Sequence, residues 1–256
     1  MEEKLNAFKR LLIVMDELRA QCPWDKKQTN ETLRHLTIEE VYELSDSILD
    51  NKTVEIKKEL GDIMLHLIFY AKIAEEQNQF TIADVLNAQC EKLIARHPHI
   101  YGNVKVNNEE DVKRNWEQIK LKEGKTSVLE GVPRSLPSMV KAQRIQEKAR
   151  GAGFDWENKT QVWEKVQEEL SEFKEASLSA NKEKMMNELG DLFFSLINYA
   201  RFIDINPDEA LERTNKKFIS RFMFMEKMVR EEGKKLNLLS LAEMDVYWNE
   251  AKKKEN

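Results

Sequence analysis

The chain has 256 residues, 34% of them charged, and a formal net charge of −5 at pH 7. This length allows two modest hydrophobic cores, and an acidic chain lacks the basic surface that nucleic-acid binding needs. Two cysteines, Cys22 and Cys90, do not make a disulfide framework, and we expect a cytoplasmic protein without a signal stretch or a membrane segment.

The composition predicts an all-α fold, because the chain contains only 8 glycines and 5 prolines. Apolar residues recur at helical spacing over residues 2–20, which predicts the first helix. The segment Thr37-Ile-Glu-Glu40 has the capping-box pattern and predicts the start of a second helix that ends near Leu49. Further helices of the first half are expected at about 53–77 and from Thr81 to about His97.

A stretch rich in glycine and proline, residues 124–137, predicts a linker between two modules. The N-terminal module is expected to span residues 1–123 and the C-terminal module residues 138–256. In the second module, Asn206-Pro207 predicts a helix start, with asparagine as the cap and proline in the first helical position. The helices expected in this half are 138–150, a hairpin like that of the first half, one from Pro207, and 239–252.

Four acidic residues of the first module recur in the second, each 129 residues later. The apolar segments that follow them match at the same offset, as 62–73 does with 191–202. This self-similarity indicates a duplicated helical module. The two tetrads are Glu40, Glu43, Glu59 and Asp62 in the first copy and Glu169, Glu172, Glu188 and Asp191 in the second.

The spacing of these acids predicts that each tetrad faces inward across a helical hairpin. Acids three residues apart share a helix face, and the tetrads are centred on Asn51 and on residue 180, both in polar segments. Clustered carboxylates repel one another unless a cation neutralises them, and oxygen ligands favour Mg²⁺, or Mn²⁺ as a substitute, over zinc. The alternatives are a solvated acidic face with lysines such as Lys57 and, for Glu40, a role as a helix-cap residue.

A basic pair accompanies each tetrad, Lys92 and Arg96 in the first module and Lys217 and Arg221 in the second. A spacing of four residues places each pair on one helix face. Arginine can grip phosphate oxygens at two points and lysine adds a point charge, so the pair favours a polyphosphate ligand. An ordinary solvated pair is the alternative.

A tryptophan and a lysine four residues apart also recur, Trp116 with Lys120 and Trp248 with Lys252. Trp248 could stack on a nucleobase or fill a hydrophobic core. His66 lies among apolar residues and is expected to be buried rather than to bind a metal. The tetrads contain no Glu-x-x-His, the motif of di-iron helical bundles, which argues against that class.

Glu-Glu-x-x-Glu followed by Glu-Leu-Gly-Asp is the pattern of the MazG family of nucleoside triphosphate pyrophosphohydrolases, and the chain resembles its two-domain bacterial members over nearly its whole length. The resemblance implies tandem all-α modules with dimeric, four-helix-bundle-like cores. It also implies a Mg²⁺-dependent reaction, NTP + H₂O → NMP + PPi, with broad nucleotide acceptance. Further blocks that carry the resemblance are Cys22-Pro-Trp-Asp25, Arg96-His-Pro-His99, Asn115-Trp-Glu-Gln118, Gly131-Val-Pro-Arg-Ser-Leu136, Gly153-Phe-Asp-Trp156 and Asn215-Lys-Lys-Phe218.

The resemblance assigns roles mainly to the second module. The metal-binding and catalytic acids it implies are Glu169, Glu172, Glu188 and Asp191. The nucleotide site it implies comprises Lys165, Lys184, Lys217, Arg221 and Trp248, to which the recurring pair adds Lys252. The N-terminal module is expected to be inactive or regulatory, with a second site at Glu40, Glu43, Glu59 and Asp62.

Apolar residues surround the second helix of the repeated hairpin, as in residues 192–197, so we expect a second subunit to cover it in a homodimer. A competing hypothesis is a scaffold that senses nucleotides or metal and recruits a partner protein. The sequence does not decide which carboxylate serves as the base, how many metal ions bind, or which nucleotide is preferred.

Overall fold

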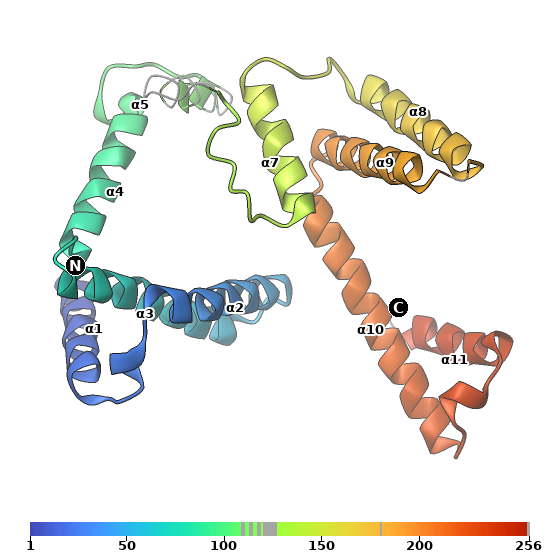
Figure 1. Ribbon diagram of the computed structural model, residues 1–256, viewed down its shortest axis with the longest axis horizontal. Coiled ribbons are helices and arrows are strands. Elements are labelled where there is room, and N and C mark those ends of the chain that lie inside the picture. The colour runs from blue at the N-terminus through green and yellow to red at the C-terminus, as the bar shows by residue number, and fades with distance from the viewer. Residues whose placement is uncertain (109–110, 113–114, 117–118, 120–126, 180, 255–256) are drawn as a thin grey trace. The chain divides into compact units, whose positions relative to one another are not determined.

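The structure is a computed structural model, and it describes residues 1–108, 111–112, 115–116, 119, 127–179 and 181–254. Regular structure in these residues is helical throughout, which confirms the predicted all-α fold (Figure 1). The chain divides into two compact units, Met1–Lys105 and Val106–Asn256. The module and linker boundaries expected from the sequence remain predictions, and residues 124–126 of the linker lie outside the described residues.

The first unit is built around a hairpin of two long helices, α2 and α3, with α1 packed against α3. Its core is formed by apolar side chains of these three helices, among them Met15, Leu33 and Phe69. The turn of the hairpin contains Asn51 with a φ of 56°, in the left-handed region that asparagine tolerates. The elements of this unit are α1 (Glu2–Gln21), η1 (Asp25–Lys27), α2 (Asn30–Leu49), α3 (Thr53–Glu76), α4 (Ile82–Arg96) and α5 (Pro98–Tyr101).

The predicted start of α2 at Thr37 is wrong, because the helix begins one residue after Thr29. Thr29 and Thr32 cap it reciprocally, each hydroxyl accepting a hydrogen bond from the other residue's backbone N–H. Thr37 lies inside the helix, where its hydroxyl bonds to the Leu33 carbonyl and lies 2.7 Å from the Tyr70 hydroxyl. Glu40 is therefore not a cap residue and its carboxylate is available for another role.

The second unit repeats the hairpin as α8 and α9, with α7 packed against α9. Three helices begin at an asparagine whose side-chain oxygen accepts from two backbone N–H groups: Asn158, Asn181 and Asn206. The last of these confirms the helix start predicted there; residue 180, the centre of the second tetrad, lies outside the described residues. The elements are α7 (Ser138–Gly151), α8 (Lys159–Ser177), α9 (Lys182–Phe202), α10 (Pro207–Glu231), η2 (Leu236–Leu238) and α11 (Leu241–Lys254).

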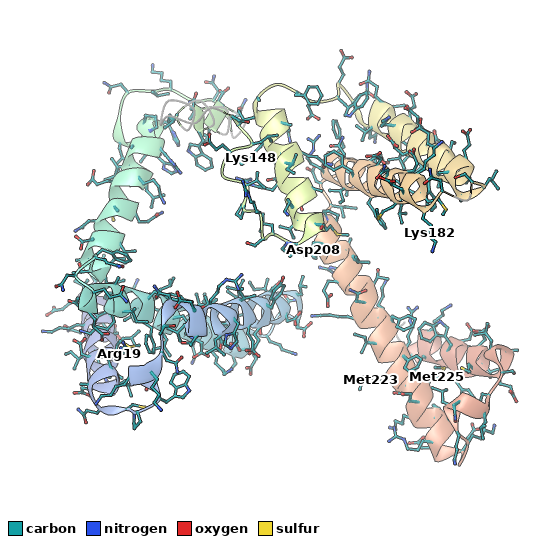
Figure 2. All side chains as sticks on the ribbon, in the orientation of Figure 1. Arg19, Lys148, Lys182, Asp208, Met223 and Met225 are labelled. Carbon is teal, nitrogen blue, oxygen red and sulfur yellow. The ribbon has the colours of Figure 1, made fainter. Side chains whose placement is uncertain are left out.

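The end of α10 forms a small core with α11. Met225 and Val229 of α10 are buried against Tyr247 of α11, whose hydroxyl donates to Glu232 over 2.6 Å. Met223, only two residues before Met225, is exposed on another side of α10 (Figure 2). The C-terminal part of the chain is thus held by a few apolar contacts and one polar network.

Both hairpins leave large apolar side chains in contact with solvent. Those on α3 and α9 that are more than two-fifths exposed include Leu60, Met64, Leu67, Met186, Phe193, Phe194 and Leu196. Exposed apolar side chains that gather on one face commonly mark an interface with another protein surface. Within the described residues, no helix combines the length and apolar character needed to cross a lipid bilayer.

Candidate metal and nucleotide site

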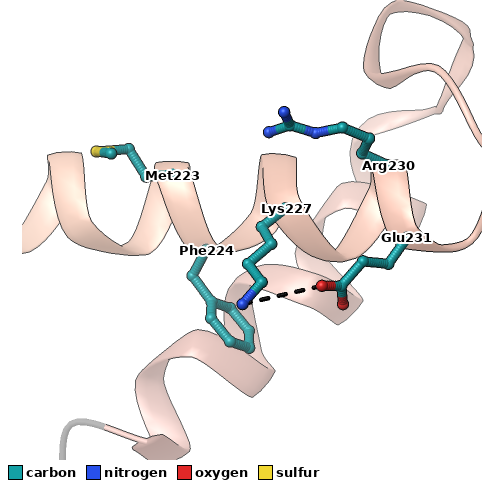
Figure 3. A pocket seen from close by; sticks show the side chains of 5 residues that line it. All are labelled: Met223, Phe224, Lys227, Arg230 and Glu231. Atoms are coloured by element: carbon teal, nitrogen blue, oxygen red, sulfur yellow. Dashed lines mark ion pairs between the residues drawn. The ribbon is translucent and has the colours of Figure 1, made fainter.

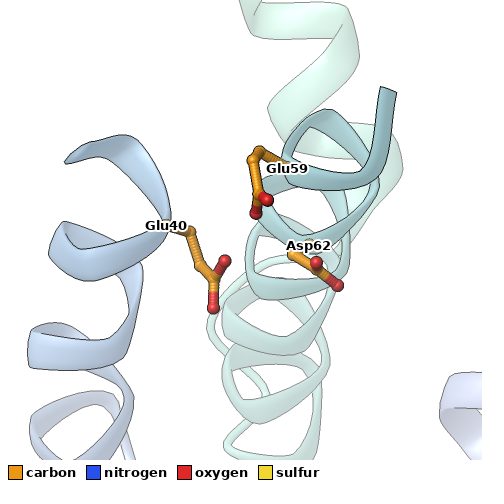
Figure 4. A group of neighbouring side chains, drawn as sticks. All are labelled: Glu40, Glu59 and Asp62. Carbon is orange, nitrogen blue, oxygen red and sulfur yellow. The ribbon is translucent and has the colours of Figure 1, made fainter. Parts of the chain in front are cut away.

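The first hairpin brings three of its four predicted acids together. Carboxylate oxygens of Glu40, Glu59 and Asp62 lie within 4.8 Å of one another, from opposite helices of the hairpin (Figure 4). Glu59 is 2% exposed; its Oε1 is 3.2 Å from Lys58 Nζ, and its Oε2 has no hydrogen-bond partner among the described residues. A buried carboxylate oxygen without a partner is costly, so this arrangement suits a bound cation.

The neighbouring carboxylates of this cluster affect the pKa of Glu40. Partial burial, followed by repulsion from Asp62, Glu43 and Glu59, raises the pKa of Glu40. Glu43, the fourth member of the tetrad, is thus close enough to act electrostatically on Glu40, although it is not one of the three with clustered oxygens.

The second hairpin divides its acids between two overlapping groups. One consists of Glu169, Glu188 and Asp191 and the other of Glu168, Glu169 and Glu172, with oxygens within 4.8 Å of one another in each. Glu169 belongs to both and is 6% exposed. All four predicted ligands therefore lie around Glu169. Glu168 was not predicted as a site residue, although the Glu-Glu doublet was part of the family pattern.

Lys165 lies in contact with this second cluster, one helical turn before it on α8. Its Nζ is 2.7 Å from Glu168 Oε1 and 2.7 Å from Glu169 Oε1. Hydrogen bonds to these two carboxylates raise the pKa of Lys165, so the side chain stays charged. Partial desolvation and repulsion from Glu169 and Glu188 raise the pKa of Glu172. A lysine and an excess of carboxylates thus share one small volume.

The other predicted nucleotide ligands stand on two further segments. Lys184 lies in the first turn of α9, four residues before Glu188 and so on the same helix side. On α10 and α11, the Arg221 guanidinium carbon is 5.9 Å from the centre of the Trp248 ring, and the Phe218 ring is 5.1 Å from the same ring.

Lys217 precedes Arg221 by one turn of α10, and Lys252 follows Trp248 by one turn of α11. Lys217, Arg221, Trp248 and Lys252 form what we call the basic–aromatic group. The structure therefore brings Arg221 and Trp248 together and the acids together, but on different helix pairs.

A shallow depression on the C-terminal half of α10 does not resemble the predicted site. It is lined by Met223, Phe224, Lys227, Arg230 and Glu231 (Figure 3). Its single acid, Glu231, lies 3.8 Å from Lys227 Nζ in an ion pair. The depression thus lacks the clustered carboxylates of the hairpins.

The remaining predicted residues of the first module are only partly described. Lys92 and Arg96 lie on α4, which ends at Arg96, and Lys120 lies outside the described residues. His66 is 8% exposed, and burial lowers its pKa, which confirms the expectation of a buried histidine. No described residue adds a histidine or cysteine to the acidic clusters.

The donor set of both clusters fits a hard divalent cation. All the clustered ligand atoms are carboxylate oxygens, which bind Mg²⁺, Mn²⁺ or Ca²⁺ in preference to softer metals. Desolvation first, and then repulsion from neighbouring carboxylates, raises the pKa values of Glu40 and Glu172, and a cation would relieve that repulsion. The unpartnered oxygen of Glu59 points to the same need.

Comparison with known proteins agrees with this geometry. The family model of the MazG nucleotide pyrophosphohydrolase domain matches residues 28–101, and that of phosphoribosyl-ATP pyrophosphohydrolase matches residues 140–218. Each match contains one acidic hairpin.

Several relatives match nearly the whole chain. The nucleoside triphosphate pyrophosphohydrolase/pyrophosphatase MazG of Thermotoga maritima is 39% identical over 257 residues, covering 98% of each chain. The nucleoside triphosphate pyrophosphohydrolase of Escherichia coli K12 is 36% identical, covering 98% of this chain and 99% of that protein. The uncharacterized protein YabN of Bacillus subtilis is 45% identical over 99% of this chain and 54% of its own length.

Two all-α hairpins with clustered carboxylates, each beside a lysine, together with the two family matches, define the class of helical nucleotide pyrophosphohydrolases. The match to the Thermotoga maritima and Escherichia coli proteins, at 39% and 36% identity, extends over almost their full length and so also shows the particular family. The chain belongs to the MazG family of nucleoside triphosphate pyrophosphohydrolases.

Proposed function

We propose that the chain hydrolyses nucleoside triphosphates at the α8–α9 hairpin, with Mg²⁺ as cofactor and with nucleotides of several bases as substrates. In NTP + H₂O → NMP + PPi, water attacks the α-phosphorus. The bond from that phosphorus to the oxygen bridging to the β-phosphorus breaks, and pyrophosphate leaves. The observation that carries the proposal is the cluster of carboxylates on two helices with Lys165 in direct contact.

The acids of this hairpin have the composition of a metal site. Glu169, Glu172, Glu188 and Asp191 would hold Mg²⁺, which when bound neutralises phosphate charge and polarises phosphorus–oxygen bonds. Lys165 is held by Glu168 and Glu169. In the complex its ammonium would turn to the phosphate oxygens, where a fixed positive charge stabilises the transition state. A carboxylate of the same cluster, or a metal-bound water that it orients, would serve as the base.

The substrate's phosphates need more positive charge than Lys165 supplies. Lys184, Lys217 and Arg221 are the candidates, with Trp248 beside Arg221 and Lys252 one turn after Trp248 on α11. Because the acids and the basic–aromatic group stand on different helix pairs, we propose that each site takes its acids from one copy and this group from its partner. The exposed apolar faces of α3 and α9 supply the surface for such a homodimer.

A second candidate substrate follows from the match to the phosphoribosyl-ATP pyrophosphohydrolase model. Phosphoribosyl-ATP carries the same triphosphate, so cleavage between its α- and β-phosphates would use the same groups. The two substrates differ in the sugar phosphate attached to the adenine, which only a site open at the base would accept.

The test is product analysis. Purified protein is incubated with Mg²⁺ and, separately, ATP, CTP, GTP, UTP, the deoxynucleotides and phosphoribosyl-ATP, and the products are resolved by ion-exchange chromatography. The proposal expects monophosphate and pyrophosphate in equal amounts. Release of orthophosphate with a diphosphate would refute the reaction, and the absence of hydrolysis with Mg²⁺ or Mn²⁺ would favour the scaffold hypothesis.

A further inference from the structure

A cavity of about 630 Å³ adjoins the acids of the second hairpin. Residues of α7, α8 and α9 and of the turn before α8 line it, including Lys165, Glu169 and Asp191 of the site described above. Gln146 holds α7 against α9 at this place, since its Nε2 donates to the Phe194 carbonyl oxygen over 2.8 Å. A volume of this size is typical of small-molecule pockets, which combine apolar walls with a few placed polar groups.

The corresponding place in the first hairpin belongs to a hydrophobic core. At the offset of 129 residues, Asn198 and Lys165 of the cavity correspond to Phe69 and Leu36. Phe69 is 2% exposed and is a member of the core of the first unit, and Leu36 packs against that core. Two polar side chains of the second hairpin therefore stand where the first hairpin has two apolar side chains.

The other walls of the cavity remain apolar. Val162 and Phe194 correspond to Leu33 and Leu65, which belong to the core of the first unit or pack against it. Phe194 is 43% exposed and Trp156 is 44% exposed, so both of these lining residues keep surface that a ligand can cover. Planar heterocycles stack favourably on aromatic rings. The walls therefore suit a nucleobase.

Asn198 gives the cavity a hydrogen-bond donor of fixed direction. Its Oδ1 accepts from Arg201 Nε over 3.1 Å and from Arg201 Nη2 over 2.8 Å. A guanidinium group only donates, so the amide must turn its oxygen towards Arg201 and its NH₂ group away. Asn198 is half-buried, and its Nδ2, which has no acceptor among the described residues, keeps surface that a ligand can reach.

The charge at this end of the cavity also favours an acceptor on the ligand. Asp155 is contacted by Arg201 over 2.9 Å and by Arg150 over 3.7 Å, so two guanidinium groups share one carboxylate. The excess positive charge attracts electronegative atoms and repels cationic ones. Every nucleobase carries such atoms on its edges, as carbonyl oxygens or ring nitrogens. A donor at this place can therefore bind a base without choosing among the bases.

We propose that the nucleoside of the substrate enters this cavity, where Asn198 Nδ2 donates to an acceptor atom of the base, and that Phe69 closes the same place in the first hairpin. Asn198 lies about 10 Å beyond Asp191 along α9, so phosphates at the acids leave the ribose and base within its reach. The inference rests on the proposed function. It adds a nucleoside subsite that fits broad acceptance, and a reason why only one hairpin takes a nucleotide.

Asn198→Phe tests the subsite by copying the first hairpin. The probes are the α,β-methylene analogue of ATP, in which the bond to be cleaved is replaced, and inorganic triphosphate, which has no nucleoside. Each is titrated by calorimetry in the presence of Mg²⁺. Because the new ring would occupy the cavity, the affinity for the analogue is expected to fall by about 10-fold or more. The affinity for inorganic triphosphate should stay within about twofold of the wild-type value.

A smaller change separates the hydrogen bond from the space. Asn198→Leu nearly keeps the size of the side chain and removes the donor, so kcat/KM should fall by about 3- to 10-fold for each of ATP, GTP, CTP and UTP. Asn187→Leu is the matched control, because Asn187 is an exposed asparagine of the same helix outside the cavity lining. An unchanged kcat/KM, or a loss confined to some of the bases, would overturn the role of Nδ2.

The titrations separate this inference from the proposed function, because calorimetry needs no hydrolysis. A loss of affinity for the analogue alone in Asn198→Phe supports the subsite even if no nucleotide releases pyrophosphate. Unchanged affinity for the analogue, an equal loss for inorganic triphosphate, or no binding of the analogue by the wild type would reject it even if hydrolysis occurs. Thermal unfolding checks the fold, and Asn198→Leu is titrated with the same two probes if Asn198→Phe does not fold.

Discussion

The two hairpins carry the same acids in the same register, yet the lysine beside each cluster comes from a different helix, Lys58 from α3 in the first hairpin and Lys165 from α8 in the second. At the same offset of 129 residues, Lys165 of the second hairpin corresponds to Leu36 of the first, and Lys184 corresponds to Glu55. Leu36 packs against the hydrophobic core of the first unit, whereas Lys165 contacts Glu168 and Glu169. If the second hairpin is the working one, as proposed, the difference to test is a lysine that reaches the acids from the first helix of the hairpin rather than from the second.

The helices that carry the two basic pairs differ in where they end relative to the arginine. α4 ends at Arg96, and Pro98 begins the next helix, so Arg96 is the last residue of its own. α10 continues ten residues beyond Arg221, to Glu231. A side chain in the middle of a helix is held more firmly than one at a fraying end, and fixed charges stabilise a transition state better than mobile ones.

The largest effect should separate the two acidic tetrads. Glu172→Gln is expected to lower kcat by about 100-fold or more, because it removes a charge that the metal and the transition state require. Glu43→Gln, the corresponding change in the first hairpin, should leave hydrolysis within about twofold. Pyrophosphate release under saturating Mg²⁺ measures both. Equal losses would mean two working sites, and a loss only in Glu43→Gln would reverse the assignment.

The next largest effect is expected from a substitution at Lys165. Lys165→Leu copies the first hairpin, and we expect kcat/KM for ATP to fall by about 10- to 100-fold, or about 1.4 to 2.7 kcal/mol. The affinity for Mg²⁺ without nucleotide should rise, because the lysine no longer competes for Glu169. Calorimetry with Mg²⁺ measures the second quantity. Parallel losses of metal affinity and activity would show instead that Lys165 only stabilises the fold.

Much of this comparison was accessible from sequence, because it depends on spacing. The acids, the turn at Asn51 and the helix start at Asn206 follow from helical periodicity and from the capping preference of asparagine. The start of α2 was misplaced because Thr37 and Thr29 both offer a capping hydroxyl, and the choice is made by the partner, Thr32. Local patterns cannot rank two such candidates.

The cavity beside the acids could not be predicted in the same way. Gln146 meets Phe194 across 48 positions of sequence, and only the packing of α7 against α9 places its amide there. A glutamine in an amphipathic helix carries no signal that its oxygen is buried without a partner. The contact between Arg221 and Trp248 likewise depends on how α11 folds back on α10.

A smaller effect tests whether two copies share each site. Glu172→Gln and Arg221→Ala are each expected to be inactive alone. After unfolding and refolding together in equal amounts, half of the dimers are mixed and one of their two sites is intact, so about one quarter of wild-type activity should return. Refolded single variants are the controls. Failure to recover activity, with mixed dimers shown by mass spectrometry of labelled copies, would place both groups of a site on one chain.

The smallest expected effect is a change of folding stability with pH, which should differ between protein with and without Mg²⁺. The raised pKa values of Glu40 and Glu172 mean that the folded protein holds these protons more tightly than the unfolded chain. Their contribution to stability is therefore full below the ordinary carboxyl pKa and is lost as pH rises through the raised values.

Mg²⁺ should relieve this repulsion where the acids are charged. We expect saturating Mg²⁺ to raise Tm by a few degrees at about pH 7.5 and by less at about pH 5, where protons compete for the same oxygens. Differential scanning calorimetry with NaCl of equal ionic strength as the control separates binding at the sites from general screening. After a chelator has removed divalent cations, Glu172→Gln should raise Tm slightly, since the substitution removes one of the carboxylates that repel one another. If Mg²⁺ and NaCl shift Tm equally at both pH values, the carboxylate clusters do not hold the cation, and the comparison of the two hairpins would have to be made on their basic groups alone.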